Sequence, residues 1–377
     1  MYVYIGNSNF ETGPEGGSPN DALTVFAFNE QTGGLTHVQT IGGVRNPSYM
    51  ARHPTLPVLY VVERWVNPDR ATPTPEQMKG DCLAAFAMNP ADGTLSLLGR
   101  APTGGESPMH VQIHRNGKFA FTANPGRPKD PDPEHGHATA IRLGPDGAPG
   151  AVAGSVKYTG RAPTWRHRPK TYPHSAFTDI DGKRLLVPQL MTDRVTIYDF
   201  DETIGQLSEN AQPYVQVSSG AGPRHLAFHP DGKHFYLVNS FDGTLSVFSY
   251  DVATGASSIV QTMSLQPAGY TGGKSASHVL VSPDGRTLYC SHRSHRSIVV
   301  FSIDAESGEL TLIGHRATNG ERPRDFAFDP SHRFMLVTNQ LANSIVTFRI
   351  DPETGDLTLT GEETKVHAPN CVVFGPA

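Results

Sequence analysis

The sequence predicts an all-β protein, a seven-bladed β-propeller of four-stranded antiparallel blades. Three observations support this fold: one hairpin motif recurs along the chain, a second hairpin alternates with it, and no helical apolar period is present. The clearest copy of the first motif covers residues 222–240, where an alternating apolar stretch leads through Pro-Asp-Gly into a second apolar stretch. Further copies start at Asn46, Ser107, Tyr172, Ala276 and Arg322, and a half copy starts at Ala368.

The second hairpin contains an apolar strand, a turn that usually ends in glycine, and another strand. Its copies cover residues 26–35, 86–95, 140–149, 197–207, 247–256, 300–310 and 347–357. The two hairpins alternate with a period of about 46–65 residues, which is the range of β-propeller blades. One copy of each hairpin supplies the four strands of one blade.

Both ends of the chain carry a strand that has no neighbour in the sequence. Residues 1–9 form a strand without a preceding partner, and residues 368–374 form a strand without a successor. Pairing these two strands would close the ring of blades and leave no unpaired inner edge. We therefore predict a closing blade made of residues 368–377 and 1–45, within a single domain over residues 1–377. A closed ring needs no partner chain, so a monomer is expected.

Composition argues against several classes of function. The formal net charge of −5 is mild, and no basic stripe indicates a nucleic-acid partner. No apolar segment reaches the roughly eighteen residues of a membrane span, and the chain begins directly as a strand without a signal-peptide pattern. The three cysteines, Cys82, Cys290 and Cys371, each lie in an apolar stretch, which predicts buried thiols in a reducing cytoplasm.

Insertions are confined to one kind of connection. The turns within hairpins are short, whereas long segments rich in Pro, Gly and charge cover residues 10–21, 64–81, 125–137, 161–172 and 266–275. Each lies after the second strand of a blade or before the first, and in an up-and-down blade these connections emerge on the same face. Since binding residues concentrate on long loops of a rigid scaffold, this face is predicted to carry the functional site.

Polar residues recur at two points of the repeat on that face. The starts of the inner strands carry His110, His174, Arg224, His225, His278, Arg324 and Asn370. The ends of the second strands carry Glu63, Asn124, Gln189, Asn239, Arg293, Asn339 and Gln340. Because the inner strands converge on the axis, these side chains would surround one pocket. Such a ring suits an anionic, oxygen-rich small molecule, since Arg grips carboxylate or phosphate and His transfers protons near neutral pH.

A structural interpretation competes with the functional one at each of these positions. A single His or Arg at a strand edge commonly bonds a neighbouring backbone carbonyl. For His225 we predict such a role, because strand alternation points it away from Arg224. His229 and His234 flank a turn on the opposite face and are predicted to be surface residues.

Motifs for other chemistries are weak. There is no G-x-S-x-G nucleophile elbow, and residues 220–223 lack the third glycine and the helix of a dinucleotide-binding fingerprint. His292 with His295, and His135 with His137, could suggest metal ligands, but no carboxylate cluster accompanies them. We therefore expect no cofactor and no metal, and a site built from protein side chains alone.

Three stretches carry a family resemblance, at residues 222–230 (Gly-Pro-Arg-His-Leu-Ala-Phe-His-Pro), 282–289 (Ser-Pro-Asp-Gly-Arg-Thr-Leu-Tyr) and 322–330 (Arg-Pro-Arg-Asp-Phe-Ala-Phe-Asp-Pro). They resemble the seven-bladed propeller lactonase family, which includes propeller-type 6-phosphogluconolactonases and fungal carboxy-cis,cis-muconate cyclases. By resemblance to the cyclases, a catalytic His falls on His174 and two catalytic Arg fall on Arg224 and Arg293. The Glu that commonly follows Asn in this family is Ser240 in this chain.

The resemblance and the ring of polar residues together imply metal-independent hydrolysis of a sugar-acid lactone. His174 would act as general base on water, and Arg224 and Arg293 would polarise the carbonyl and hold the oxyanion. The substrate would be a small anionic or polyhydroxylated lactone, bound by His110, Asn239, His278, Arg324, Asn339 and Glu63. Two alternatives are a muconate-type cyclase, which would close a lactone in the same ring, and a non-catalytic propeller that binds a ligand or a protein on its loop-rich face.

Overall fold

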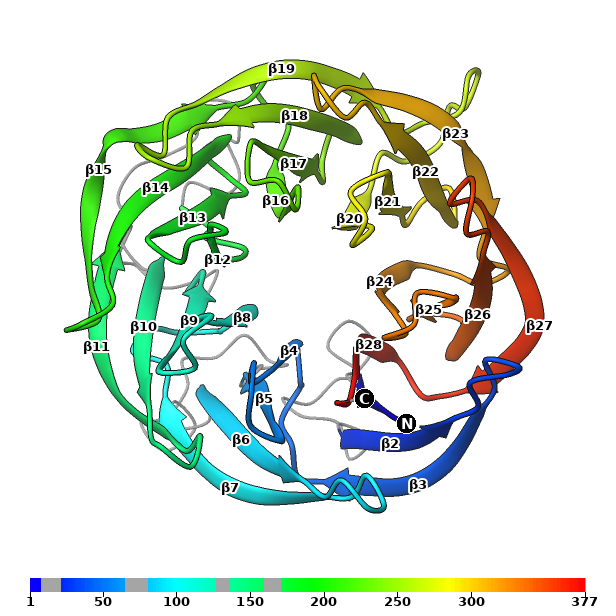
Figure 1. Cartoon of the computed structure of the whole chain (residues 1–377), viewed down its shortest axis with the longest axis horizontal. Coiled ribbons are helices and arrows are strands. Elements are labelled where there is room, and N and C mark those ends of the chain that lie inside the picture. The colour runs from blue at the N-terminus through cyan, green and yellow to red at the C-terminus, as the bar shows by residue number, and fades with distance from the viewer. Residues whose placement is uncertain (8–21, 65–80, 127–135, 159–170, 377) are drawn as a thin grey trace, which may run out of the picture.

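The computed structural model describes residues 1–7, 22–64, 81–126, 136–158 and 171–376 of the chain. Within these ranges every regular element is a strand, and the strands form seven antiparallel sheets of four. The sheets stand as blades around a central axis, each with its inner strand nearest to that axis (Figure 1). The predicted seven-bladed propeller is therefore confirmed, and the described residues contain no helix that could cross a membrane.

The closing blade consists, from the axis outward, of β28 (Pro369–Phe374), β1 (Tyr2–Asn7), β2 (Ala22–Phe28) and β3 (Leu35–Gly42). The next three blades are β4 (Tyr49–Arg52), β5 (Val58–Glu63), β6 (Cys82–Met88) and β7 (Leu95–Pro102); β8 (His110–Ile113), β9 (Phe119–Asn124), β10 (His137–Leu143) and β11 (Pro149–Lys157); and β12 (Phe177–Thr178), β13 (Arg184–Gln189), β14 (Arg194–Asp201) and β15 (Gln206–Gln216). The last three are β16 (Pro223–Phe228), β17 (His234–Asn239), β18 (Thr244–Tyr250) and β19 (Ser257–Ser264); β20 (Ala276–Val281), β21 (Thr287–His292), β22 (Ser297–Ile303) and β23 (Leu310–Ala317); and β24 (Pro323–Phe328), β25 (Phe334–Asn339), β26 (Ser344–Ile350) and β27 (Leu357–Lys365).

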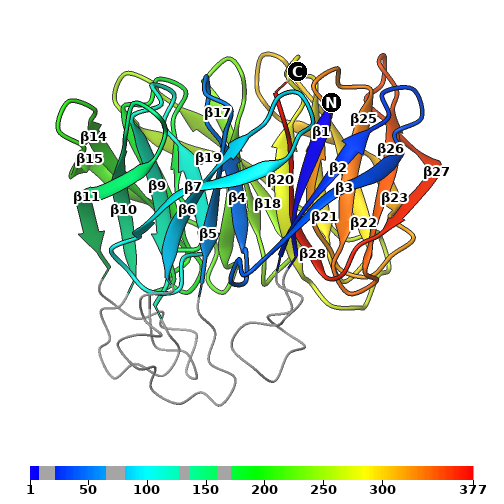
Figure 2. The same ribbon diagram turned by 90° about the horizontal axis from the view of Figure 1, so that it is seen from below.

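The ring is closed by pairing between the two ends of the chain. β28 runs antiparallel to β1, with Val3 opposite Phe374 and Ile5 opposite Val372. Both termini consequently lie side by side on one face of the disc, as Figures 1 and 2 show. This pairing confirms the predicted closure of the ring and gives β1 a strand partner on each side.

The hydrophobic core lies between the blades. The second strand of a blade is covered on both faces by its neighbours, so all six residues of β17, from His234 to Asn239, are buried. The outermost strand β19 contains mostly partly buried or exposed residues, because one of its edges faces solvent. A typical inter-blade cluster joins Tyr236 and Val247 of one blade to Val279 and Leu288 of the next. Cys82, Cys290 and Cys371 are free, buried thiols, as predicted.

Hydrogen bonds from tyrosines and histidines tie neighbouring blades together. The hydroxyl groups of Tyr60, Tyr236 and Tyr289 donate to the carbonyl oxygens of Gly147, Gly308 and Gly355. The Nε2 atoms of His53, His114 and His229 bond the carbonyl oxygens of Gly117, Gly182 and Gly285 in the same way. The prediction that His234 is a surface residue is wrong, since its ring is buried against Gly308 of the next blade.

These contacts give a test of inter-blade stability. Tyr60→Phe removes a 2.7 Å hydrogen bond to the Gly147 carbonyl while keeping the aromatic packing. We expect the free energy of unfolding to fall by about 1–2 kcal/mol, because a buried carbonyl loses its donor. Urea unfolding of the variant and the wild type measures this difference, and an unchanged midpoint would contradict it.

Several inner strands contain a β-bulge near their start. In β16, Pro223 lies opposite Asn239 and His225 lies opposite Val238, so Arg224 is an extra residue. The same shift occurs in β24 between Pro323 and Asp325. A bulge interrupts the alternation of side chains and re-aims them locally. Consecutive residues at these strand starts can therefore face the same cavity.

The prediction of one loop-rich face can be followed only in part. Most of segments 10–21, 64–81, 125–137 and 161–172 lies outside the described residues. Segment 266–275 is described and forms a connection without strands between β19 and β20, which is the predicted kind of position.

Candidate active site

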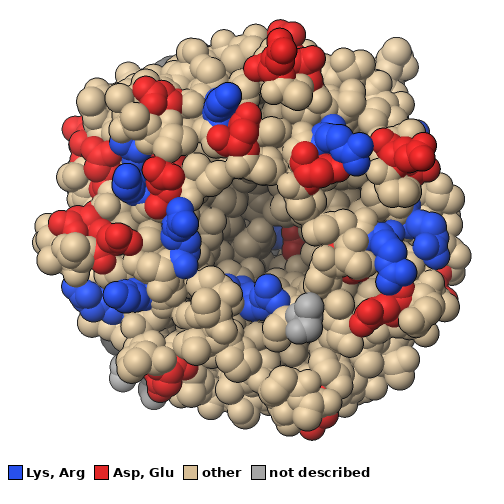
Figure 3. Space-filling model, in the orientation of Figure 1, with Lys and Arg blue, Asp and Glu red and all other residues tan. Residues whose placement is uncertain are grey.

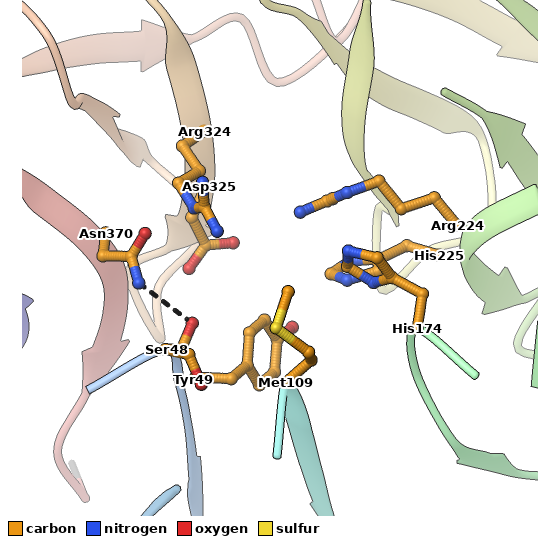
Figure 4. Close-up of a pocket in the computed structure, with 9 residues that line it drawn as sticks. All are labelled: Ser48, Tyr49, Met109, His174, Arg224, His225, Arg324, Asp325 and Asn370. Carbon is orange, nitrogen blue, oxygen red and sulfur yellow. Dashed lines mark hydrogen bonds between the residues drawn. The ribbon is translucent and has the colours of Figure 1, made fainter. Parts of the chain in front are cut away.

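A small pocket lies on the propeller axis at the starts of the inner strands. It is lined by Ser48, Tyr49, Met109, His174, Arg224, His225, Arg324, Asp325 and Asn370 (Figure 4). These residues come from six of the seven blades, all of them at or just before an inner strand. On the opposite face, which carries the short turns within hairpins, the centre of the disc is a deep hollow with charged atoms visible within it (Figure 3). The propeller thus brings residues that are far apart in the sequence onto one cavity.

Arginine dominates the charge of this cavity. Arg224 and Arg324 point into it from two different blades (Figure 4), and Arg293 lies close enough to lower the pKa of Arg224. Burial, followed by repulsion from Arg324, lowers the pKa of Arg293 to about 9. Asp325 is the one carboxylate of the described lining, whereas two buried guanidinium groups line the pocket and a third, that of Arg293, lies close behind it. A site of this composition attracts an anionic ligand.

Asp325 is held by groups from two neighbouring strands. Its Oδ2 accepts a hydrogen bond of 3.0 Å from the Val372 backbone N–H, and its Oδ1 lies 3.5 Å from Nε2 of His278. Burial raises the pKa of Asp325 to about 7, against the opposing effects of the Val372 bond and of Arg224. The carboxyl group can therefore exist with or without its proton near neutral pH.

Four histidines cluster around the axis. His174 and His225 line the pocket, and their ring centroids are 5.2 Å apart. Burial, with smaller effects of Arg224 and the other histidines, holds the pKa of both well below 6.5, so both are neutral at pH 7. His110 packs against Tyr49 at a centroid distance of 4.4 Å, and Nδ1 of His278 lies 2.9 Å from Nδ1 of His225.

Side chains from adjacent blades fix the backbone of these strand starts. The hydroxyl of Ser175 donates to the Arg224 carbonyl at 2.5 Å, and that of Ser277 donates to the Arg324 carbonyl at 2.7 Å. The carboxylate of Asp193 accepts the backbone N–H groups of Gly220 and Gly222, four and two residues before Arg224. The arginines are therefore pre-positioned by the scaffold before any ligand binds.

The predicted site residues fall into three groups. His174, Arg224 and Arg324 line the pocket. Arg293, His110 and His278 lie directly behind it, and Nη2 of Arg293 donates to the Ser240 hydroxyl at 2.9 Å. Glu63, Asn239 and Asn339 are outside the lining: they bond Arg100, Thr244 with Ser246, and the Thr318 carbonyl, respectively.

The structure corrects the expected orientation of His225. Alternation predicts that it points away from Arg224, but both side chains line the pocket. The bulge between Pro223 and His225 is the reason, because the extra residue resets the alternation. His225 therefore belongs to the site.

Four lining residues were not predicted: Ser48, Tyr49, Met109 and Asp325. A signal for them exists in the repeat itself, because each occupies the first or second position after a proline that begins or precedes an inner strand. Asp325, for example, corresponds in this register to His225. The predicted ring contained only His, Arg and Asn at these strand starts, so Ser, Tyr, Met and Asp at the same points were not included.

Among the residues that the structure describes, no group of three or more His, Cys, Asp or Glu side chains is arranged to hold a metal ion. Nδ1 of His292 accepts the His295 backbone N–H at 3.0 Å, and Nδ1 of His295 bonds the Ser297 hydroxyl. His137 begins β10, whereas His135 is outside the described ranges.

Comparison with known proteins identifies the class. The family described as "Lactonase, 7-bladed beta-propeller" matches residues 10–374, so the chain belongs to this family. It is 35% identical to the 6-phosphogluconolactonase of Serratia proteamaculans over 241 residues, and 33% identical to that of Yersinia pestis over 240 residues. Each alignment covers 64% of this chain, and they cover 66% and 65% of the respective relatives.

Solved structures agree over the whole chain. The periplasmic gluconolactonase PpgL of Pseudomonas aeruginosa superimposes with a TM-score of 0.87 at 25% identity, covering 100% of this chain and 99% of that protein. A protein from Lactobacillus plantarum superimposes with a TM-score of 0.82 at 26% identity, covering 98% of both chains. The resemblance expected from the sequence is therefore confirmed at the level of the family.

Proposed function

We propose that this protein is a lactonase that hydrolyses a sugar-acid lactone. The observation that carries the proposal is the pocket, in which a neutral histidine and two arginines face one small cavity on a rigid ring. Lactone hydrolysis needs a base to activate water and a positive group to hold the oxyanion of the tetrahedral intermediate. The names of the two sequence relatives, and that of the Pseudomonas structure, support the same reaction class.

His174 is the group that we assign as general base. Its ring is neutral because burial holds its pKa well below 6.5, and its Nδ1 has no hydrogen-bond partner among the described residues. A neutral imidazole at the pocket wall can take a proton from water as the water oxygen attacks the lactone carbonyl. The resulting imidazolium would be transient, since Arg224 and Arg324 disfavour a second positive charge nearby.

Arg224 is the group that we assign to the carbonyl oxygen. It lies across the cavity from Arg324 (Figure 4) and also donates to the Ser277 carbonyl, which fixes its guanidinium. Arg293 would contribute mainly through its charge, because its Nη2 is already bonded to Ser240. Arg324 would then bind an acidic or phosphate end of the substrate. The excess of arginine over carboxylate favours an anionic lactone such as 6-phosphogluconolactone over a neutral one.

A hydrolysis assay over a panel of lactones tests this function. The panel contains glucono-δ-lactone, 6-phosphogluconolactone, pentonolactones and muconolactones, each measured by pH indicator with and without chelator. We expect turnover of a sugar-acid lactone that chelator does not reduce, and a loss of about 100-fold in kcat for His174→Ala. Turnover that chelator abolishes, or full activity of His174→Ala, would contradict the mechanism, and turnover of no sugar lactone would contradict the function.

A further inference from the structure

Asp325 is an acidic group that the scheme above leaves without a role. It faces His174 and His225 from the other side of the pocket (Figure 4). Hydrolysis of a lactone also requires a proton for the ring oxygen, because an alkoxide is a poor leaving group. A base on one wall and an acid on the opposite wall would serve the two ends of the bond that is broken.

Asp325 is connected to His225 through His278. Oδ1 of Asp325 lies 3.5 Å from Nε2 of His278, and the Nδ1 atoms of His278 and His225 are 2.9 Å apart. Two neutral imidazoles in such contact must share one proton between the facing nitrogens, so one ring donates and the other accepts. The three side chains therefore form a continuous polar chain from one pocket wall to the other.

The geometry allows two proton arrangements in this chain. When Asp325 is ionised, His278 presents Nε2–H to it, and His225 donates from Nδ1 to His278. When Asp325 is protonated, it donates to Nε2 of His278, which then donates from Nδ1 to His225, and His225 carries its proton on Nε2. The protonation of Asp325 is thus coupled to the tautomer of His225, whose ring lies 5.2 Å from that of His174.

The groups around Asp325 come from every neighbouring inner strand. They are Arg224 on β16, His278 on β20, Cys371 on β28, Tyr49 on β4, and Arg324 on its own strand. Burial raises the pKa of this carboxyl to about 7, although Arg224 and Arg324 favour the ionised form. A protonated fraction is therefore available at neutral pH.

We propose, on the basis of the lactonase activity above, that Asp325 is the general acid that protonates the leaving ring oxygen, with His278 and His225 as its positioning residues. In this step the hydroxyl of Asp325 turns from His278 toward the pocket, its O–H bond breaks, and an O–H bond forms on the ring oxygen. The acyl C–O bond breaks and its electron pair stays on that oxygen. After the product leaves, His174 releases to solvent the proton it took from water, and Asp325 regains one from solvent.

The activity test is the pH profile of kcat/KM for wild type and Asp325→Asn. Asn keeps an oxygen for the Val372 N–H, and its amide can donate to Nε2 of His278, so the fold is preserved. An acid must be protonated, so wild-type activity is expected to fall as the pH rises above about 7. Asp325→Asn is expected to lose about 100-fold at pH 6 and to show no such fall. A wild-type profile in Asp325→Asn would overturn the assignment.

Two further variants separate catalysis from structure. His278→Ala admits water beside the Asp325 carboxylate, and water favours the ionised form. The fall of kcat/KM at alkaline pH is therefore expected to begin at a lower pH than in the wild type. His114→Gln removes another buried histidine, one that bonds the Gly182 carbonyl between blades, and should leave the pH profile unchanged. Equal shifts of the kcat/KM profile in both variants would show that the profile reports the stability of the fold. That result would overturn the role of His278.

Imidazole ¹⁵N NMR tests the coupled chain without any substrate. In the wild type, the tautomers of His225 and His278 are expected to switch together as the pH passes about 7. In Asp325→Asn, the two neutral rings should keep the tautomers expected beside protonated Asp325, with His278 protonated on Nδ1 and His225 on Nε2. Independent or pH-invariant tautomers in wild type would overturn the coupling. A wild type that switches but hydrolyses no lactone would refute the proposed function, and with it the acid role. An active wild type whose Asp325→Asn variant keeps the profile would refute the acid role alone.

Discussion

Replacing Arg224 by Met is expected to lower kcat/KM for the lactone by about 1000-fold, the upper end of the loss seen when one oxyanion donor is removed. The Arg224 guanidinium is buried at the pocket wall, and its backbone is anchored by Ser175 from the neighbouring blade. Because it is fixed before the substrate arrives, its contribution to the transition state needs no reorganisation. The measurement is steady-state kinetics on the lactone that the panel identifies.

Two variants make this result interpretable. Arg224→Lys keeps the positive charge but loses the planar fork, so it is expected to retain part of the activity that Met loses. Arg286→Met removes an exposed arginine that pairs with Asp284 at a hairpin turn, and it should stay within twofold of wild type. A fall in Arg286→Met as large as in Arg224→Met would show that the loss is not specific to the pocket.

The fold was predictable because the same pair of hairpin motifs recurs along the sequence. The two alternating hairpins specify the blades, and the unpaired strands at both ends specify the closure, which β28 and β1 then form. Six of the seven blades contribute residues at or just before their inner strand to the pocket lining, so the repeat register indicates where such side chains converge. Such redundancy makes a repeat protein easier to interpret than a fold in which each element occurs once.

The site was predictable only in outline, for two physical reasons. The first is the β-bulge at the start of β16, which no alternation rule anticipates and which turns His225 toward the pocket. The second is that the family resemblance predicts a carboxylate at the position after Asn239, which is Ser240 in this chain, whereas the carboxylate that lines the pocket is Asp325 on a different blade. Some polar repeat residues reach the cavity, whereas others pair with a neighbouring side chain, as Glu63 does with Arg100. This difference depends on three-dimensional packing, which the repeat pattern does not contain.

The largest expected effect on stability comes from Asp179, at the turn between β12 and β13. Its Oδ1 accepts the backbone N–H groups of Lys183 and Arg184, and its Oδ2 accepts the Tyr250 hydroxyl of the next blade at 2.9 Å. Oδ2 also lies 3.4 Å from Nη1 of Arg184. Asp179→Ala would leave the buried Arg184 with Asp199 as its one remaining ion-pair partner among the described residues, and the Asp199 side chain is partly exposed. We expect the free energy of unfolding to fall by about 3 kcal/mol, measured by urea unfolding.

A matched change at another hairpin turn shows why burial decides this effect. Asp284→Ala removes a carboxylate that also pairs with an arginine, Arg286, but both side chains are largely exposed. Its cost is expected to stay below about 1 kcal/mol, since solvent already screens the pair. Equal losses in the two variants would mean that the turn conformation, and not the buried ion pair between blades, sets the stability. Asp179 lies at the turn of its blade, away from the pocket lining, so Asp179→Ala that remains folded should keep the wild-type KM for the lactone.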